Sequence, residues 1–457
     1  MEKKLLSFKQ LFAMGLGFTL GSAVFSLTGV AAMYTGGSTF LAYIVGGAAI
    51  LIMMFPTILA ASIVPRQGVS YSLTGESLGH TAKGIYFWIF AIGRIAILAN
   101  ATAFSIFFTS VFTTLNPKIV TAVLVIVFYI TNFFGLQSAA NVQRVLNLIL
   151  YISLGIFIVL GIIHMDTVFV FNAENFMIGG AGGFFSAVST LVFSLGGGMA
   201  MLELGGAVEK PEKNLPRVCI LVTMSVSLIF AGIALATLGS LPLVPMAEGG
   251  ASTPNTLLFT GPSNSVVNAA VAILSNGSPL FYFFIFGGAC LAIGTTVNAS
   301  YGWYPAAFLK ACADGWFPKW FGKLNQYGAP YRIQALFLLA GIIPLFFFPA
   351  ENISTVNTTV IKASTNLQIL SNILPNFGLL VLPRLYPALW EKSRWHMSKG
   401  VLWAVTLICT GISIWLWALN FLALSTGSQI VLGILFAVGI VYAVIGSRTF
   451  APKKEAA

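Results

Sequence analysis

The sequence predicts an all-α polytopic membrane protein of twelve transmembrane helices, with a 5+5 inverted repeat and discontinuous helices 1 and 6. Three observations predict this fold. Of the 457 residues, 58% are hydrophobic and only 8% are charged, too few charges for the surface of a soluble protein of this length. Apolar runs long enough to cross a bilayer recur along the chain. Glycine-rich breaks interrupt two of these runs, within residues 15–29 and 193–217.

The individual spans follow from the need for about 20 mainly apolar residues to cross the hydrocarbon layer. The candidates are residues 10–33, 38–64, 84–114, 119–135, 143–164, 182–207, 216–242, 278–310, 332–349, 354–383, 400–421 and 427–446.

Basic residues predict the orientation of these spans. With the N-terminus in the cytoplasm, all but three of the 23 Lys and Arg residues fall in cytoplasmic loops, tails or helix ends. The exceptions are Lys118 in an exterior loop, and Arg94 and Lys362 within spans. We therefore expect an integral inner- or plasma-membrane protein with both termini in the cytoplasm, and the net charge of +11 needs no nucleic-acid partner to account for it.

The chain is expected to consist of two repeats of five spans each, followed by two further spans and a tail. Spans 1–5 form the first repeat (residues 1–164) and spans 6–10 the second (165–390), while residues 391–457 hold the last two spans and a tail. Five spans are an odd number, so the second repeat is inverted, and the glycine breaks then fall in the first span of each repeat.

The glycine breaks are the predicted substrate site. Lipid offers no hydrogen-bond partners, so unwound backbone at this depth implies a polar cavity or a ligand. A half-helix N-terminus attracts a carboxylate, and half-helix carbonyls attract an ammonium group. Close packing of helices through small residues is the alternative. The residues assigned to substrate binding on this basis are Gly21, Ser22 and Ala23 in the first break and Gly196, Gly197 and Gly198 in the second.

Ionisable residues within spans are further candidates. An uncompensated Arg at the bilayer centre costs ~2.5 kcal/mol or more on insertion scales. Arg94 is therefore expected either to contact substrate or to serve as an internal counter-charge for Glu203. Glu203 is a candidate proton carrier or the partner of a basic residue near the cytoplasm. Lys362 is expected to snorkel towards the exterior or to line an outer vestibule.

Hydroxyl and amide groups in spans eight and ten extend the site. Thr295 and Thr296 are candidate oxygen ligands for a coupling sodium ion, although Thr hydroxyls in membrane helices commonly bond to carbonyls of their own helix. Gln368 is assigned to substrate binding. The four cysteines have no CxxC spacing, and we expect buried thiols, no metal site and no cofactor.

Four stretches of the chain resemble the amino acid–polyamine–organocation (APC) superfamily. GLGFTLGSAVFSLTG resembles its first-span pattern GxGxxxGxGxFxxxG, and AVEKPEKNLPR resembles its pattern after span six. ADGWFPKWFGKLNQYGAPYR and LPRLYP resemble the patterns after spans eight and ten. The matches are in order and extend over about residues 10–390.

This resemblance implies an amino acid permease or exchanger with broken helices one and six. It implies that Phe193 covers the substrate from outside and that Ser300 lines the site. GRIA, at Arg94, resembles a GNIA-like stretch of a family antiporter whose Asn contacts substrate. The chain departs from the pattern at Ala23, where a glycine is usual, and at Leu150, where a lysine is often found, which argues against a lysine-based proton-coupling scheme. A further alternative for Arg94 is that it stands in for this missing lysine of span five.

The expected function is secondary active transport of amino acids or related amines and carboxylates by alternating access, through exchange or proton coupling. A fixed guanidinium at Arg94 favours acidic or neutral over dibasic substrates. Sodium-coupled symport is the alternative. A membrane-embedded transferase is a further alternative of another class, which the scarcity of acid–base groups within spans disfavours, and a channel is disfavoured because no repeated pore segment is seen. The expected partners are the substrate and the lipid bilayer; the oligomeric state is left open.

Overall fold

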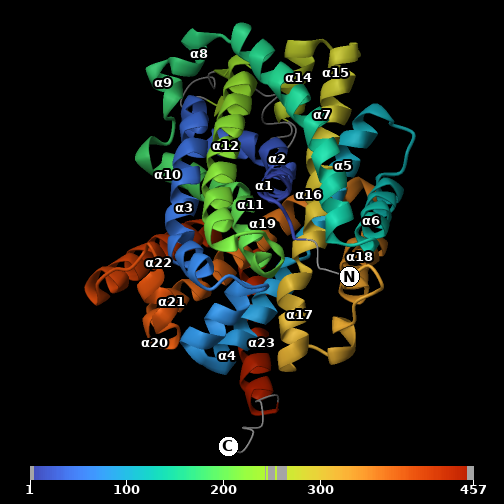
Figure 1. Ribbon diagram of the computed structural model, residues 1–457. Coiled ribbons are helices and arrows are strands. Elements are labelled where there is room, and N and C mark those ends of the chain that lie inside the picture. The colour runs from blue at the N-terminus through green and yellow to red at the C-terminus, as the bar shows by residue number, and fades with distance from the viewer. Residues whose placement is uncertain (1–4, 242, 245–252, 255–264, 450–457) are drawn as a thin grey trace, which may run out of the picture.

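The computed structural model describes residues 5–241, 243–244, 253–254 and 265–449. Helices packed side by side make up most of the molecule (Figure 1). The helices α8, α14 and α15 lie at one end, and α23 lies at the other. The strand β1 (Leu243–Val244) pairs antiparallel with β2 (Thr253–Pro254). The protein is thus a helical, polytopic membrane protein.

The N-terminal part of the chain begins with a capped helix. The hydroxyl of Ser7 accepts a hydrogen bond from the backbone N–H of Gln10, and the Gln10 side chain accepts one from the N–H of Ser7. The elements as far as residue 163 are α1 (Phe8–Thr19), α2 (Ser22–Thr35), η1 (Gly36–Ser38), α3 (Thr39–Ile63), α4 (Val69–Gly93), α5 (Ala96–Val111), α6 (Pro117–Phe133) and α7 (Leu136–Ile163).

The middle of the chain contains short helical pieces between two long helices. These elements are α8 (Thr167–Phe171), α9 (Ala173–Phe176), α10 (Gly180–Leu191), η2 (Val192–Leu195), α11 (Gly197–Ala200), η3 (Met201–Glu203), η4 (Gly205–Ala207) and α12 (Pro211–Ser240).

The remaining elements run from the π-helical η6 to the last two long helices. They are α14 (Ser265–Leu274), α15 (Pro279–Phe283), η6 (Phe284–Cys290), α16 (Leu291–Trp303), α17 (Pro305–Asp314), η7 (Lys319–Gly322), α18 (Tyr331–Ile342), η8 (Ile343–Phe346), η9 (Ala350–Asn352), α19 (Ile353–Ile373), η10 (Leu374–Phe377), α20 (Gly378–Leu385), α21 (Pro387–Lys392), α22 (Lys399–Leu422) and α23 (Thr426–Thr449).

Fewer than the twelve expected helices are long and apolar enough to be counted as membrane spans. In the described part of the chain, eight helices are long and apolar enough to cross a bilayer, or up to nine if one pair bent by 119° counts as a single span. Helical residues do occupy all twelve expected segments. Breaks and bends divide several of these segments into pieces too short for the criterion, and α6 has only 17 residues. Twelve spans and the 5+5 repeat therefore stay predictions.

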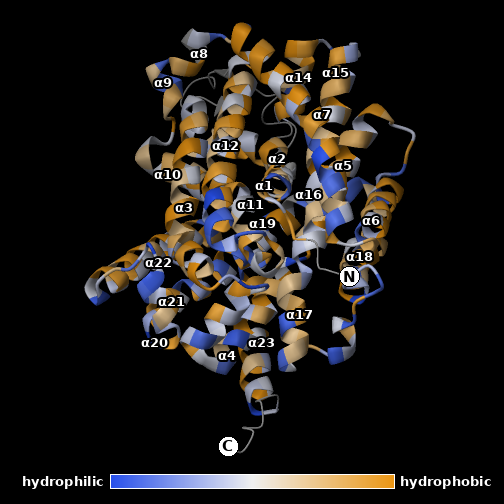
Figure 2. Cartoon of the chain, in the orientation of Figure 1, coloured by the Kyte–Doolittle hydropathy of each residue, from blue (hydrophilic) through white to orange (hydrophobic). Residues whose placement is uncertain are grey.

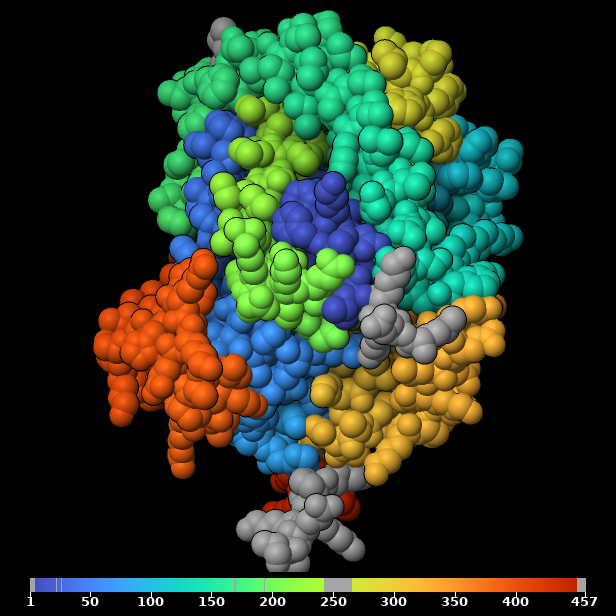
Figure 3. Space-filling view, in the orientation of Figure 1, coloured from blue at the N-terminus to red at the C-terminus, as the bar shows by residue number. Residues whose placement is uncertain are grey.

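Hydrophobic residues predominate along the helices, and hydrophilic residues are frequent around α20, α21 and the loop after α17 (Figure 2). The N-terminal helix α1 packs between α7 and α12 and also contacts α16 (Figure 3). The four cysteines are free and buried, as the sequence predicts. Because α1 is held on three sides, its broken end lies in the interior of the helix bundle.

Candidate functional site

The first glycine-rich segment is a true interruption between two helices. Helix α1 ends at Thr19, and α2 starts at Ser22 with Gly21 as its N-cap in an extended conformation, at φ −98° and ψ −158°. The Gly21 N–H donates to the Thr19 carbonyl over 2.8 Å. The first turn of α2 leaves backbone N–H groups without partners in the helix, as every helix start does.

The second glycine-rich segment is interrupted over a longer stretch. Helix α10 ends at Leu191, and short 3₁₀ and α pieces follow as far as Ala207 before α12 begins. Gly196 is the N-cap of the four-residue helix α11. Neither glycine segment is therefore part of a continuous α-helix.

The two interruptions lie against each other. A Cβ atom on Gly197 would come within 2.0 Å of Thr19 Oγ1 and 2.9 Å of Thr19 Cα. A Cβ atom on Gly21 would come within 2.5 Å of Thr296 Oγ1 on α16. A side chain at Gly197 would collide with the side chain and Cα of Thr19, and one at Gly21 would collide with the side chain of Thr296, so both positions favour glycine.

A cavity of about 100 Å³, here called the central cavity, lies between the two interruptions. Six of the sequence-predicted residues line it: Gly21, Ala23, Gly196, Gly197, Thr296 and Gln368. The sequence reasoning missed other polar residues of its wall, namely Asn100, Ser194, Tyr304, Ser364 and Thr365. These residues are isolated hydroxyl and amide side chains in apolar helices. Nothing in the sequence distinguishes such a residue from one whose side chain bonds to the carbonyls of its own helix.

The hydroxyls of Thr295 and Thr296 meet the broken end of α1. Both donate to the Gly17 carbonyl, at 3.1 and 3.2 Å, and Thr296 also lies 3.2 Å from the Phe18 carbonyl. Both hydroxyls lie within hydrogen-bond distance of Ala292 O on their own helix as well. Oxygen atoms of α1 and α16 thus converge at one point, and hydrogen bonds already link them there.

A second cavity, here called the inner cavity, adjoins the central cavity and shares Phe18, Gly196 and Gln368 with it. Arg94 and Glu203 both line the inner cavity, and only 3% and 4% of their surfaces are exposed. The structure therefore places these two sequence-predicted residues together, beside the central cavity and not in its wall.

Aromatic rings and the backbone hold the Arg94 side chain. Its Nε donates to the Phe90 carbonyl over 3.0 Å. Its guanidinium carbon lies 4.1, 4.9 and 4.5 Å from the ring centroids of Phe90, Trp303 and Tyr304. Cation–π contacts of this kind stabilise a desolvated guanidinium. Nη1 has no hydrogen-bond partner among the described residues.

Glu203 is similarly incomplete in its hydrogen bonding. Its Oε1 accepts from the Ser70 backbone N–H over 3.3 Å, whereas Oε2 has no partner among the described residues. Two opposite charges, each with an unused polar atom, thus face one small buried space. A buried charge is tolerated when an opposite charge or a polar ligand compensates it.

The other sequence-predicted residues lie elsewhere. Ser300 is buried and donates to the Thr296 carbonyl one turn away on α16. Gly198 packs against Cys219, whose thiol donates to the Gly198 carbonyl over 3.2 Å. The side chains assigned to the site at Ser22 and Phe193 lie outside the described part of the structure.

Two ion pairs involve residues of α4, Glu76 and Lys83. Arg66 forms a two-point contact with Glu76 at 2.7 Å for each hydrogen bond, and Tyr386 donates to the same carboxylate over 3.0 Å. Lys83 pairs with Asp314 at the end of α17. Arg66 and Glu76 are only ten residues apart in sequence, whereas Tyr386 and Asp314 come from distant segments of the chain.

Comparison with known proteins places this geometry in context. Residues 6–451 match a family model described as amino acid permease. An uncharacterised protein of Methanocaldococcus jannaschii is 24% identical over 79% of this chain and 80% of its own length. The branched-chain amino acid permease BcaP of Bacillus subtilis is 23% identical over 73% of each chain. The serine/threonine exchanger SteT of the same organism is 26% identical over 58% of this chain and 62% of its own.

Proposed function

The chain belongs to the amino acid permease family and is a transporter, not an enzyme, and from that premise we propose that it is a secondary active transporter working by alternating access. The single observation that carries the proposal is the meeting of two interrupted helices across a buried cavity. The free N–H groups at the start of α2 suit a carboxylate, and the carbonyls of the second interruption suit an ammonium group. A zwitterionic amino acid carries both groups.

Arg94 supports a preference for acidic or neutral amino acids. The guanidinium lies beside the central cavity, and its Nη1 is not used by described residues. A second positive charge on a dibasic substrate would be repelled there, whereas an extra carboxylate would be attracted. The relatives include proteins named for branched-chain amino acids, for serine and threonine, and for aspartate. None of these is dibasic, which agrees with the preference proposed here.

Exchange is the coupling mode that the surroundings of α1 favour. Leu150 on α7 is fully buried and brings no charge to this region. The side chains that approach Gly17 from α7 are the uncharged amides of Gln143 and Asn147. Glu203 is the remaining candidate for proton coupling. Sodium symport is the second candidate, because Thr295 and Thr296 direct their hydroxyls at the α1 carbonyl oxygens and sodium prefers oxygen ligands.

The proposed cycle rocks one helical bundle against the other around the central cavity. We propose the 5+5 arrangement for it, with residues 1–164 and 165–390 as the repeats and both termini in the cytoplasm. In this orientation the Arg66–Glu76 and Lys83–Asp314 pairs lie on the cytoplasmic side. They support a state in which the cytoplasmic path is closed.

The test is counterflow in proteoliposomes. Vesicles loaded with unlabelled L-leucine, L-serine, L-aspartate or L-arginine are diluted into the labelled form of the same amino acid. We expect saturable, transient accumulation of at least one neutral or acidic amino acid, without sodium, and little accumulation of arginine. Uptake that requires sodium would support the symport alternative. Flux that does not saturate and shows no counterflow would contradict the carrier proposal.

A further inference from the structure

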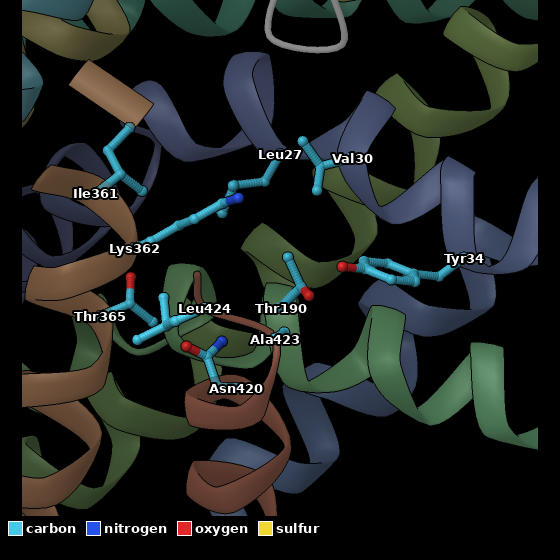
Figure 4. A pocket seen from close by; sticks show the side chains of 10 residues that line it. All are labelled: Leu27, Val30, Tyr34, Thr190, Ile361, Lys362, Thr365, Asn420, Ala423 and Leu424. Atoms are coloured by element: carbon cyan, nitrogen blue, oxygen red, sulfur yellow. The ribbon is translucent and has the colours of Figure 1, made fainter. Parts of the chain in front are cut away.

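A third cavity lies on the opposite side of the central cavity from Arg94. This outer cavity is enclosed by α2, α10, α19 and the end of α22. Figure 4 shows the amino group of Lys362 and the hydroxyl of Tyr34 pointing into it from opposite sides. Lys362 is the tenth residue of the 21-residue helix α19. An exposed charge near the middle of an intramembrane helix is expected to serve a function.

The outer cavity has a net positive charge. Lys362 is the single charged side chain among the ten residues that line it. Neither of the two ion pairs found among the described residues includes Lys362. The other polar groups in the wall include the hydroxyls of Tyr34, Thr190 and Thr365, which carry no formal charge. An anionic group is therefore the occupant whose charge the cavity complements.

The three cavities form a series. The outer and central cavities share Leu27, Ile361 and Thr365 in their walls. The central and inner cavities share Phe18, Gly196 and Gln368. Lys362 thus stands at one end of a line of adjoining cavities and Arg94 at the other. The outer cavity therefore adjoins the space between the two broken helices.

We propose that Lys362 forms an outer receiving site for the carboxylate of the amino acid, occupied before the substrate reaches the central cavity. The outer cavity, at about 30 Å³, has room for a group of the size of a carboxylate and not for a whole amino acid. It therefore receives one end of the substrate. This inference rests on the proposed function, and on the orientation that places the end of α2 outside.

The physical role of such a site is to speed capture. Lys362 is exposed, so water and salt screen its charge, and lasting affinity at this point is small. A fixed charge at the mouth of a path instead raises the encounter rate of an oppositely charged group, and salt weakens that effect. The site thus acts on uptake from the exterior and leaves binding in the central cavity unchanged.

The test compares the two faces of the membrane in the Lys362→Gln variant. Uptake of L-leucine, L-serine and L-aspartate is measured in right-side-out and inside-out vesicles at low and high ionic strength. For each amino acid that the wild type transports, we expect the external KM at low salt to rise, with kcat and the internal KM unchanged. The rise should be about fivefold for L-aspartate, which has a net negative charge, and smaller for the zwitterions L-leucine and L-serine. High salt should raise the external KM of the wild type but not that of the variant.

Two further variants sharpen this test. Lys362→Arg keeps the positive charge, and its external KM should stay close to that of the wild type. Lys118→Gln removes another lysine placed on the exterior, whose ammonium donates to the Phe348 carbonyl outside the outer cavity, and should leave the external KM unchanged. An equal change on both faces, or no change in the Lys362→Gln variant, would overturn the receiving site. Absence of amino acid transport by the wild type would instead overturn the proposed function.

Discussion

At the residue scale, the contact between Gly197 and Thr19 determines how close the two broken helices come. We expect Gly197→Ala to separate them, because the added methyl group would lie 2.0 Å from Thr19 Oγ1 and 2.9 Å from the Thr19 backbone. Overpacking of this kind costs ~1–3 kcal/mol. The thermal stability of the purified protein should fall, and the stabilisation by added substrate should be lost.

The matched control for this substitution is Gly182→Ala in α10, which lies before the second interruption that begins after Leu191. A Cβ atom there meets nothing within 4 Å. Because alanine favours a helix over glycine by up to ~1 kcal/mol, Gly182→Ala should keep or slightly raise the stability and preserve the response to substrate. Equal losses in the two variants would contradict the close approach seen at Gly197.

Arg94 is the second residue with a specific expected effect. Arg94→Gln removes the guanidinium, and we expect the ratio of aspartate to arginine uptake to fall by about tenfold, the factor that corresponds to ~1.4 kcal/mol. The measurement is competition by each amino acid against labelled uptake in proteoliposomes.

The double variant Arg94→Gln/Glu203→Gln distinguishes substrate contact from a counter-charge role. If Arg94 acts on the substrate, the double variant should show the same lowered ratio of aspartate to arginine uptake as Arg94→Gln alone. If Arg94 only neutralises Glu203, removing both charges should return the preference towards that of the wild type. The second result would contradict the proposed role of Arg94 in substrate specificity.

At the element scale, a chain of buried amides joins α16 to α6 and α7. Asn298 accepts a hydrogen bond from Asn132 over 2.8 Å and donates to Gln143 over 2.7 Å. Gln143 donates to Asn147 over 3.3 Å, and Asn147 donates to the Ala13 carbonyl of α1 over 2.7 Å. The chain connects the inner half of the first broken helix to three other helices without any charged group.

Removing the central amide should therefore loosen these helices. We expect Asn298→Ala to destabilise the protein by ~1–3 kcal/mol, because Asn132 and Gln143 each lose a buried hydrogen-bond partner. The midpoint temperature of thermal unfolding in detergent measures this loss of stability. Ser300→Ala on the same helix is the control. Within the described part of the chain, the Ser300 hydroxyl bonds to Thr296 of its own helix, so the loss of stability in this variant should be much smaller. A similar loss in both variants would contradict a linking role for the amides.

At the scale of the whole molecule, the distribution of basic residues predicts which face is the cytoplasm. Lys323 lies in the loop after η7, and Lys118 lies at the start of α6. In a variant without native cysteines, we expect Lys323→Cys to react with an impermeant maleimide only in inside-out vesicles and Lys118→Cys only in right-side-out vesicles. The reverse pattern would invert the proposed orientation and move Lys362 to the cytoplasmic side.

Much of the architecture is determined by the sequence itself. The scarcity of charge predicts membrane helices, because lipid provides neither water nor hydrogen-bond partners for exposed polar groups. The glycines at 21 and 196–198 predict interrupted helices, because glycine imposes little conformational preference of its own. Both breaks are present in the structure. The count of twelve spans is not reached by length and hydropathy, because the second break, a bend of 119° between two later helices and the 17-residue length of α6 leave pieces that do not satisfy the criterion.

Only the tertiary structure decided which residues meet. Arg94 and Glu203 are more than a hundred positions apart in the sequence, and packing of α4 against η3 brings them to one cavity beside the central one. The same packing gathers Asn100, Tyr304 and Thr365 around the broken helices, although no spacing marked them. The local sequence determines where the helices are interrupted and backbone groups lack partners within a helix. Contacts between distant segments determine which side chains and cavities those backbone groups face.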